Sequence, residues 1–200
     1  AAVAAARVGA RVFLLERYGA LGGMATAALV HSICGLYHLR RESTAIPANS
    51  GLPLEFAARL LATGDARGPV RLGRVDLLLH RPASFALVAD QWVTAQPQIR
   101  TWLHTEVFGA ARTDAGYRID TICRGRHRSL TAKAMIDATG DAAVIALLSQ
   151  PFRVAEAARL QRPAFIFGLQ GVAADLEDDR LRLQIAHRIT TATRTGALPP

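Results

Sequence analysis

The sequence has almost no lysine, little cysteine and no hydrophobic run long enough to cross a membrane. Lys133 is the single lysine, so nearly all of the formal charge of +8 comes from arginine. Cys34 and Cys123 lie far apart and form neither a Cys-x-x-Cys pair nor a zinc-binding pattern. This cysteine usage fits a reducing compartment. No window reaches the roughly 20 apolar residues of a membrane span. These absences predict a cytoplasmic protein with no membrane partner and no metal site.

The basic charge is not gathered as a nucleic-acid surface would require. The arginines are scattered, and no stripe interleaves them with aromatic residues. The densest cluster, Arg124, Arg126 and Arg128, lies in a predicted hairpin turn, where a solvated surface is the simpler interpretation. We therefore expect no nucleic-acid partner. Half of the 200 residues are apolar and a fifth are charged, which is ordinary for a globular protein.

The most informative stretch runs from Ala10 to Thr26. Its apolar run Val12–Leu15 predicts a buried strand, and Glu16 follows directly. An acid at the carboxyl end of the second strand of a nucleotide-binding sheet can accept both ribose hydroxyls of an adenosine. Gly22 and Gly23 would let the backbone approach a ligand, because they have no Cβ. An ordinary strand with a surface glutamate and a flexible turn explains this spacing equally well.

The residues before that strand indicate a helix with nothing in front of it. Residues 1–8 are rich in alanine, which favours a helix, and Gly9 stands where helices often end. The sequence opens inside this helix without Met, and it contains no G-x-G-x-x-G turn. In a dinucleotide fold, a first strand and that turn precede such a helix. The pattern therefore predicts a fragment, truncated at its front.

The stretch over 6–37, ARVGARVFLLERYGALGGMATAALVHSICGLY, resembles a known family. It is similar to FAD-dependent oxidoreductases related to the fumarate reductase and succinate dehydrogenase flavoproteins and to the heterodisulfide reductase A subunit. Their Glu-Arg pair and Leu-Gly-Gly-Met-Ala-Thr motif match Glu16, Arg17 and residues 21–26, and their Ala-Thr-Gly-Asp motif matches 138–141. The resemblance implies an α/β fold: a Rossmann-like FAD-binding domain, with a parallel sheet and a three-stranded β-meander, plus an inserted α+β substrate domain.

The resemblance also implies residues that bind FAD in an extended form. They are Glu16, Arg17, Gly22, Gly23, Met24, Ala25, Thr26, Val107, Ala138, Thr139, Gly140 and Asp141. Glu16 would hold the adenosine, residues 23–26 would lie near the flavin, and the backbone of Val107 would meet the adenine edge. Gly140 would allow close approach, and Asp141 would hydrogen-bond to the dinucleotide. Asp141 is equally a good N-cap for a helix over 142–148.

Three side chains after the glycine turn would lie on the substrate side in this family. They are His31, Cys34 and Tyr37. For His31 and Cys34 we favour an ordinary structural role, a packed or half-exposed histidine and a small buried thiol. No residue compels an acid–base role, so the sequence predicts no catalytic residue.

Periodicity predicts the remaining elements. Helices are expected over 54–63, 82–94 and 175–189, the last with Asp175 as N-cap and a buried line of Leu181, Ile185 and Ile189. Strands are expected over 99–104, 107–112, 117–122, 128–132, 134–140 and 164–172, with 113–116 as a hairpin turn. Loops are expected over 40–53 and 65–74.

The implied domain organisation is discontinuous. Residues 1–43 and 96–150 would form the FAD-binding domain, and residues 44–95 and 151–200 a partial substrate or cap domain. The implied activity is hydride transfer between a small-molecule substrate and FAD, with an electron-transfer partner or a second copy of the chain as further partners. Two alternatives stay open: an NAD-dependent dehydrogenase with a Rossmann fold, and an inactive truncated remnant that binds no cofactor.

Overall fold

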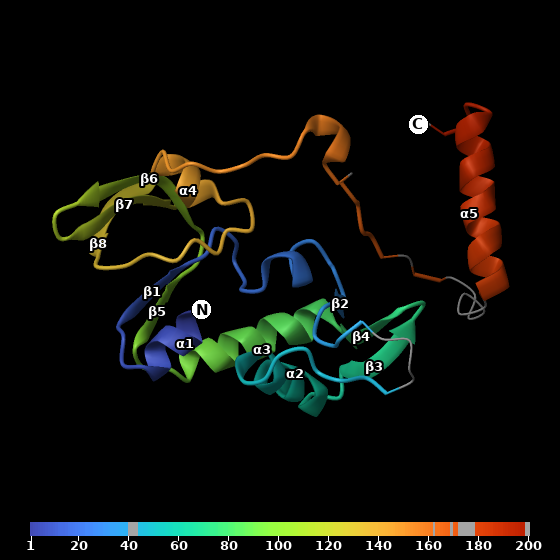
Figure 1. Cartoon of the computed structure of the whole chain (residues 1–200), viewed down its shortest axis with the longest axis horizontal. Coiled ribbons are helices and arrows are strands. Elements are labelled where there is room, and N and C mark those ends of the chain that lie inside the picture. Colours follow the sequence, from blue (N-terminus) through green and yellow to red (C-terminus); the bar gives the residue numbers. More distant parts are fainter. Residues whose placement is uncertain (40–43, 162, 169, 172–178, 199–200) are drawn as a thin grey trace. The chain divides into compact units, whose positions relative to one another are not determined.

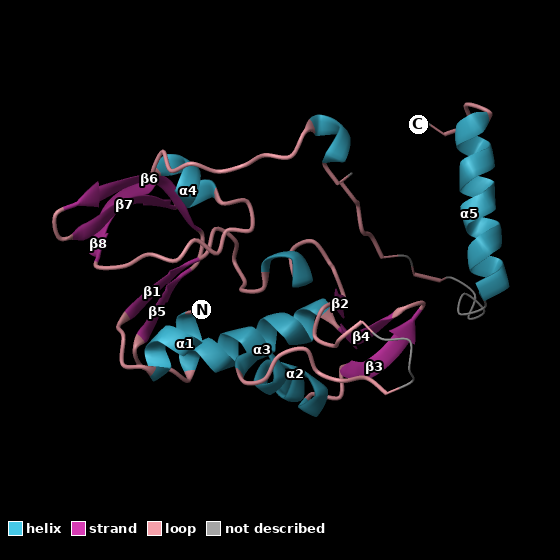
Figure 2. Cartoon of the chain, viewed as in Figure 1, coloured by secondary structure: helices cyan, strands magenta, loops and turns pink. Residues whose placement is uncertain are grey.

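The computed structural model describes residues 1–39, 44–161, 163–168, 170–171 and 179–198. The chain divides into two units, residues 1–166 and 167–200, and each is described by itself. The described part of the first unit holds three small sheets with the helices α1 to α4, and that of the second holds one helix (Figures 1 and 2). The predicted division into an FAD-binding and a substrate domain stays a prediction.

A two-stranded parallel sheet joins the start of the chain to its middle. β1 (Val12–Leu15) pairs with β5 (Ile99–Trp102) along their whole length. The helices α1 (Ala2–Arg7) and α3 (Pro82–Thr94) pack against this sheet. Their shared core contains Val3, Leu21, Trp92 and Val93. The strand expected over 12–15 is confirmed, but Phe13 is 46% exposed, so only one face of the strand is buried.

A second sheet has the order β2-β4-β3 and is antiparallel. Its strands are β2 (Ser32–Ile33), β3 (Ala66–Leu72) and β4 (Val75–His80). The helix α2 (Leu52–Ala62) contacts both β3 and α3. Leu60 of α2 and Leu78 of β4 are completely buried in the core between these elements. This core explains why the apolar faces of two short helices are stable against so small a sheet.

The loop expected over 65–74 is wrong, because most of it is strand β3. Gly68 and Pro69 interrupt the period of two, and the register of β3 on β4 shifts between Arg67 and Val70. The alternation of inward and outward side chains along β3 is therefore not evident from the sequence. Arg71 lies on β3 and forms an ion pair at 3.0 Å with Asp76, a buried residue of β4.

The third sheet is the predicted meander, in the order β6-β7-β8. Its strands are β6 (Thr105–Thr113), β7 (Gly116–Cys123) and β8 (Arg126–Ala132). All three pair antiparallel in sequence order, and the turn at Asp114 and Ala115 is confirmed. The alternation of side chains with a period of two predicts these strands well, because glycine-containing turns separate them.

The last predicted strands are wrong. Residues 134–140 form no strand, and Ile136 is 66% exposed. Asp137, within this run, instead accepts backbone N–H groups at the start of the helix α4 (Ala143–Leu147). Residues 163–168 form no strand either, and Phe165 is 88% exposed, while 169 and 172 lie outside the described residues. A short turn, η2 (Ala157–Arg159), precedes them.

The second unit contains the helix α5 (Asp179–Arg194), which confirms the helix expected near the end of the chain. The proposed N-cap, Asp175, lies outside the described residues, as does the side chain of Leu181. Ile185 and Ile189 are 40% and 52% exposed, so the buried line expected along this helix is not buried here.

The carboxylate of Glu55 connects the helices α1, α2 and α3. Glu55 of α2 accepts two hydrogen bonds from the guanidinium of Arg7, at 2.6 and 2.7 Å. It also accepts hydrogen bonds from Arg59, at 3.1 Å, and from the indole nitrogen of Trp92, at 3.2 Å. The hydrogen bond from Arg7 is the main reason why the pKa of Glu55 falls from about 4.5 to about 2.

We expect the Glu55 network to lose its stabilising effect in acid. The folded-state pKa is lower than the unfolded one, so the contribution is complete above pH 4.5 and is lost as the pH falls towards 2. Glu55→Gln should lower the urea midpoint at neutral pH, and the difference from the wild type should shrink in acid. Glu106→Gln, an exposed change on β6, is the control. A difference that is independent of pH would contradict the role given to this carboxylate.

Candidate functional site

The carboxyl ends of β1 and β5 lie side by side, and Glu16 directly follows β1 at this edge. Leu15 is paired with Trp102, the last residue of β5. The N–H of Glu16 donates to the carbonyl of Trp102 at 2.9 Å, and the carbonyl of Glu16 accepts from the N–H of Thr105 at 2.9 Å. In open α/β sheets, ligands bind beyond this end of parallel strands. The structure thus places Glu16 at the edge where the sequence predicted a ligand.

Within the described residues, one oxygen of the Glu16 carboxylate accepts a hydrogen bond and the other does not. Its Oε1 atom accepts the N–H of Tyr18 at 2.8 Å, which fixes the side chain over the turn that follows β1. The residue is half-buried, and within the described ranges no other hydrogen bond or ion pair involves its carboxylate. Its second oxygen can therefore accept hydrogen bonds from a ligand. Arg17, the next predicted residue, is exposed and lies over the Tyr18 ring at 4.9 Å.

The predicted glycine turn is a single 3-10 turn, η1 (Gly23–Ala25). The N–H of Ala25 donates to the carbonyl of Gly22 at 3.0 Å, and the Thr26 hydroxyl donates to the carbonyl of Gly23 at 3.2 Å. Leu21, only 8% exposed, fixes the start of the turn in the core. Met24, 71% exposed, lies on its solvent side. The turn is therefore anchored at one end and open on its outer face.

The two glycines of the turn have different surroundings. Gly22 has φ of 117°, and a Cβ there would lie 2.9 Å from Cδ1 of Phe85 and 2.6 Å from the methyl group of Thr26. Gly23 has φ of 51°, and a Cβ there would meet nothing within 4 Å. Gly22 is thus required by the protein's own packing, whereas Gly23 faces open space that a ligand can occupy.

Val107 lies on the edge strand of the meander. The N–H of Thr105 is bonded to Glu16, so it is directed away from β7. Backbone groups in an antiparallel ladder alternate in direction, and the register shift begins only after Val107. The N–H and C=O of Val107 therefore face the same side as those of Thr105. Within the described residues, this side of β6 has no neighbouring strand at Val107.

The segment 138–141 is organised by Asp137, a residue that the sequence interpretation did not select. One Asp137 oxygen accepts from the backbone and hydroxyl of Thr139, at 3.0 and 2.7 Å. The other accepts the N–H groups of Val144 and Ile145, at 3.0 and 3.1 Å. Burial raises the pKa of Asp137, but these hydrogen bonds together lower it by more, so the net pKa is below its usual value.

The predicted N-cap role of Asp141 is therefore wrong. Ala142 is the cap residue of α4, with φ of 54°, and the capping side chain is Asp137. Asp141 and Gly140 are exposed, and a Cβ on Gly140, where φ is 85°, would meet nothing within 4 Å. The signal that could have identified Asp137 is its place two residues before Thr139, a spacing that favours an Asx turn.

The structure brings some predicted residues together and leaves others apart. β1 contacts β6, which connects Glu16 to the strand of Val107, and α4 contacts β6, which brings the 138–141 segment to the same sheet. No hydrogen bond or ion pair within the described ranges joins 138–141 to Glu16 or to the glycine turn. The substrate-side candidates His31 and Cys34 are both exposed, so the expectation of a buried thiol is wrong.

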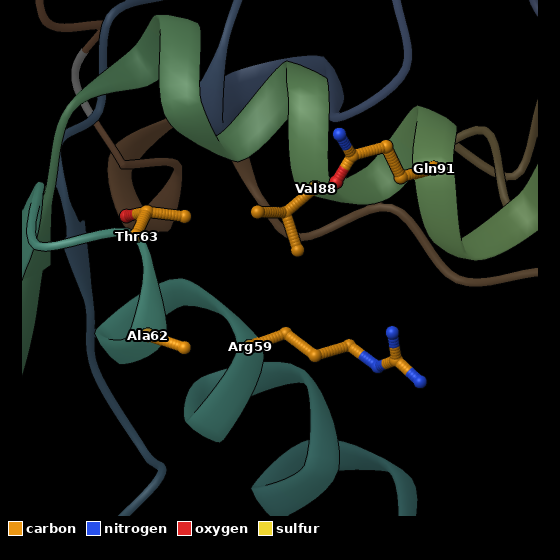
Figure 3. Close-up of a pocket in the computed structure, with 5 residues that line it drawn as sticks. All are labelled: Arg59, Ala62, Thr63, Val88 and Gln91. Atoms are coloured by element: carbon orange, nitrogen blue, oxygen red, sulfur yellow. The ribbon is translucent and has the colours of Figure 1, made fainter.

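A groove elsewhere on the first unit contains none of the predicted cofactor residues. It lies between α2 and α3, and Figure 3 shows its lining: Arg59, Ala62, Thr63, Val88 and Gln91. Among the residues that the structure describes, no three acidic, histidine or cysteine side chains gather as metal ligands would. None of the described helices combines the length and the apolar character of a bilayer-crossing segment.

Comparison with known proteins gives one informative match. A family model described as "FAD dependent oxidoreductase" matches residues 1–198, nearly the entire sequence. No curated protein matches. Among solved structures, p-nitrophenol 4-monooxygenase PnpA from Pseudomonas putida DLL-E4 is similar, at 16% identity and a TM-score of 0.36. The similarity covers 66% of this chain and 35% of that one, so the chain spans about a third of its length. On the family match, the chain belongs to the FAD-dependent oxidoreductases, and its cofactor is FAD.

Proposed function

We propose that the chain holds FAD in an extended form and takes part in hydride transfer between a small-molecule substrate and the flavin. The observation that carries this proposal is the position of Glu16 at the paired carboxyl ends of β1 and β5, with one carboxylate oxygen free. A ribose offers two neighbouring hydroxyls, and a carboxylate at this position can accept both. The adenosine end of the cofactor would therefore lie beyond these strands.

The residues around this edge suit an extended dinucleotide. Gly23 and Gly140 both have positive φ and open space where a Cβ would point, so a ligand can approach their backbone closely. The free edge of β6 offers the N–H and C=O of Val107, a donor and acceptor pair that suits an adenine edge. These features support the proposed contacts at the adenosine end of FAD and along the glycine turn.

The chain's own residues would bind and orient rather than react. Glu16 would hold the sugar, and Asp137 would keep the 138–141 segment in place by pinning it to the first turn of α4. The turn at Gly23–Thr26 would face the flavin end. When bound, FAD supplies the hydride chemistry, and the protein supplies its position and its surroundings.

Titration of the purified chain with FAD tests this proposal. We expect saturable quenching of flavin fluorescence at micromolar FAD, and binding weaker by about tenfold or more for Glu16→Gln, since a hydrogen bond to a charged group contributes roughly 1.5 to 3 kcal/mol. Glutamine can still accept the N–H of Tyr18, so the turn should keep its shape. Glu106→Gln removes one negative charge from the neighbouring strand β6 and is the matched control.

Two results would count against the proposal. Equal weakening by Glu16→Gln and Glu106→Gln would indicate a general charge effect and no ribose contact at Glu16. The absence of saturable FAD binding in the wild type would favour the inactive remnant instead. Circular dichroism of both variants should match the wild type, so that a loss of affinity is not a loss of fold.

A further inference from the structure

His80 is a buried polar side chain whose ring nitrogens have no hydrogen-bond partner of good geometry among the residues that the structure describes. It ends β4, and it is 5% exposed. Neither Nδ1 nor Nε2 contacts solvent or has a partner within the described residues. Buried polar atoms in folded proteins are nearly always satisfied, and an orphan imidazole destabilises the fold. Leucine here would simply continue the apolar run Leu77–Leu79. Such exceptions are expected at functional positions.

The His80 ring is linked to the glycine turn through one aromatic side chain. Its centroid lies 4.9 Å from that of Phe85, in the first turn of α3. The ring of Phe85 also lies against the turn, since a Cβ on Gly22 would lie 2.9 Å from Cδ1 and 3.0 Å from Cε1 of this ring. Phe85 therefore contacts the His80 ring and also lies against the position of Gly22.

The charged neighbours of His80 offer it no counter-ion. His31, before β2, accepts the backbone N–H of His80 at 2.9 Å through its carbonyl. Asp65, before β3, is already engaged, because its carboxylate accepts the Ser84 hydroxyl at 2.6 Å and lies 3.4 Å from Arg81. Burial lowers the pKa of His80, the Arg81 backbone raises it, and the charge of His31 lowers it, with a net decrease. The lowered pKa favours the neutral imidazole at pH 7.

We propose that His80 is a positioning residue for the glycine turn: the neutral imidazole holds Phe85 against Gly22, and protonation releases both. The relation to FAD rests on the proposed function, while the coupling of His80 to the turn does not. An imidazolium with no acidic partner must reach water. Its movement towards solvent withdraws the support behind Phe85. The folded-state pKa is lower than the unfolded one, so this support is complete above about pH 6.5 and is lost as the pH falls further.

Amide hydrogen exchange of the ligand-free chain tests the coupling directly. The N–H groups of Ala25 and Ala27 report on the turn, because they donate to Gly22 and Gly23. We expect their protection, corrected for intrinsic exchange, to fall about tenfold in the wild type between about pH 7.5 and pH 5.5. His80→Leu should give the same protection at both pH values and equal or higher stability at pH 7.5. His127→Gln, which changes an exposed histidine on β8, should behave as the wild type.

Phe85→Leu and an FAD titration complete the test. Phe85→Leu keeps the imidazole but shortens the connection, so the turn should lose protection already at pH 7.5; unchanged protection would overturn the proposal even if His80→Leu fails to fold. An equal pH dependence in His80→Leu and the wild type would overturn it as well. FAD affinity should follow protection, falling in acid for the wild type and not for His80→Leu. If the wild type binds no FAD but its turn responds to pH through His80, the proposed function fails and this inference stands.

Discussion

Gly22→Ala is expected to lower the free energy of unfolding by about 3 kcal/mol and to remove measurable FAD binding. A non-glycine residue at φ of 117° is strained by roughly 1 to 3 kcal/mol. The new methyl group would also lie 2.9 Å from the ring of Phe85, and forcing extra volume into a packed site costs about 1 to 3 kcal/mol more. The turn that we propose to face the flavin would have to shift.

Gly23→Ala is the matched control for this prediction. Its Cβ would meet no atom within 4 Å, and its φ of 51° costs alanine about 1 to 2 kcal/mol. Urea unfolding should therefore show a smaller loss for Gly23→Ala than for Gly22→Ala. FAD titration should nevertheless show weaker binding for Gly23→Ala, because its methyl group occupies the space proposed for the cofactor. Equal stabilities of the two variants would contradict the expected steric clash between a side chain at position 22 and the ring of Phe85.

Leu60→Ala is expected to destabilise the first unit by about 2 to 5 kcal/mol, the usual cost of emptying a fully buried leucine site. Leu60 is 0% exposed and packs in one core with Leu36, Leu78 and Val88. The side chains around it come from different elements, so the cavity cannot collapse by the movement of a single loop. Urea unfolding followed by circular dichroism gives the free energy directly.

Leu61→Ala offers a control on the same helix. Leu61 is 39% exposed, so its removal deletes fewer contacts and leaves no cavity, and we expect a loss of about 1 kcal/mol or less. Both variants change the helix propensity equally, so their difference isolates burial. Similar losses for both would mean that α2 does not pack on the second sheet as described.

Local sequence signals predicted the elements that carry their own boundaries. The helix over 82–94 was predicted at both ends, because Pro82 suits a first turn and Phe85, Val88 and Trp92 define one apolar face. The meander was predicted from its alternation and from the turn before Gly116. In each case the signal lies within a few residues of the element, so no tertiary contact was needed to recognise it.

Elements that depend on distant partners were missed. β3 looked like a loop because Gly68 and Pro69 disrupt its period, and its pairing with β4 becomes evident only from the register. Residues 134–140 were predicted as a buried strand from their apolar residues. The hydrogen bonds from the start of α4 to Asp137 cannot be recognised from a hydrophobic pattern. The first error comes from relying on an unbroken period of two, and the second from treating an apolar run as sufficient evidence of a strand without asking what it pairs with.

The candidate site shows the same division. The position of Glu16 after an apolar run predicted its place at the strand ends, and this place is confirmed by the backbone bonds to Trp102 and Thr105. The assignment of a ribose contact to it stays a prediction. His80 could not be selected from the sequence, because its lack of partners is a property of the packed core around it.

The unpaired side of β6 also affects how the chain behaves when its ligand is missing. Past Thr105, this side of the strand faces no other strand within the described residues, and Phe108 beside it is 48% exposed. Such a border is a template for strand addition by another molecule. If the cofactor binds at Val107 as we propose, it would cover part of this border, and we expect less strand addition in its presence.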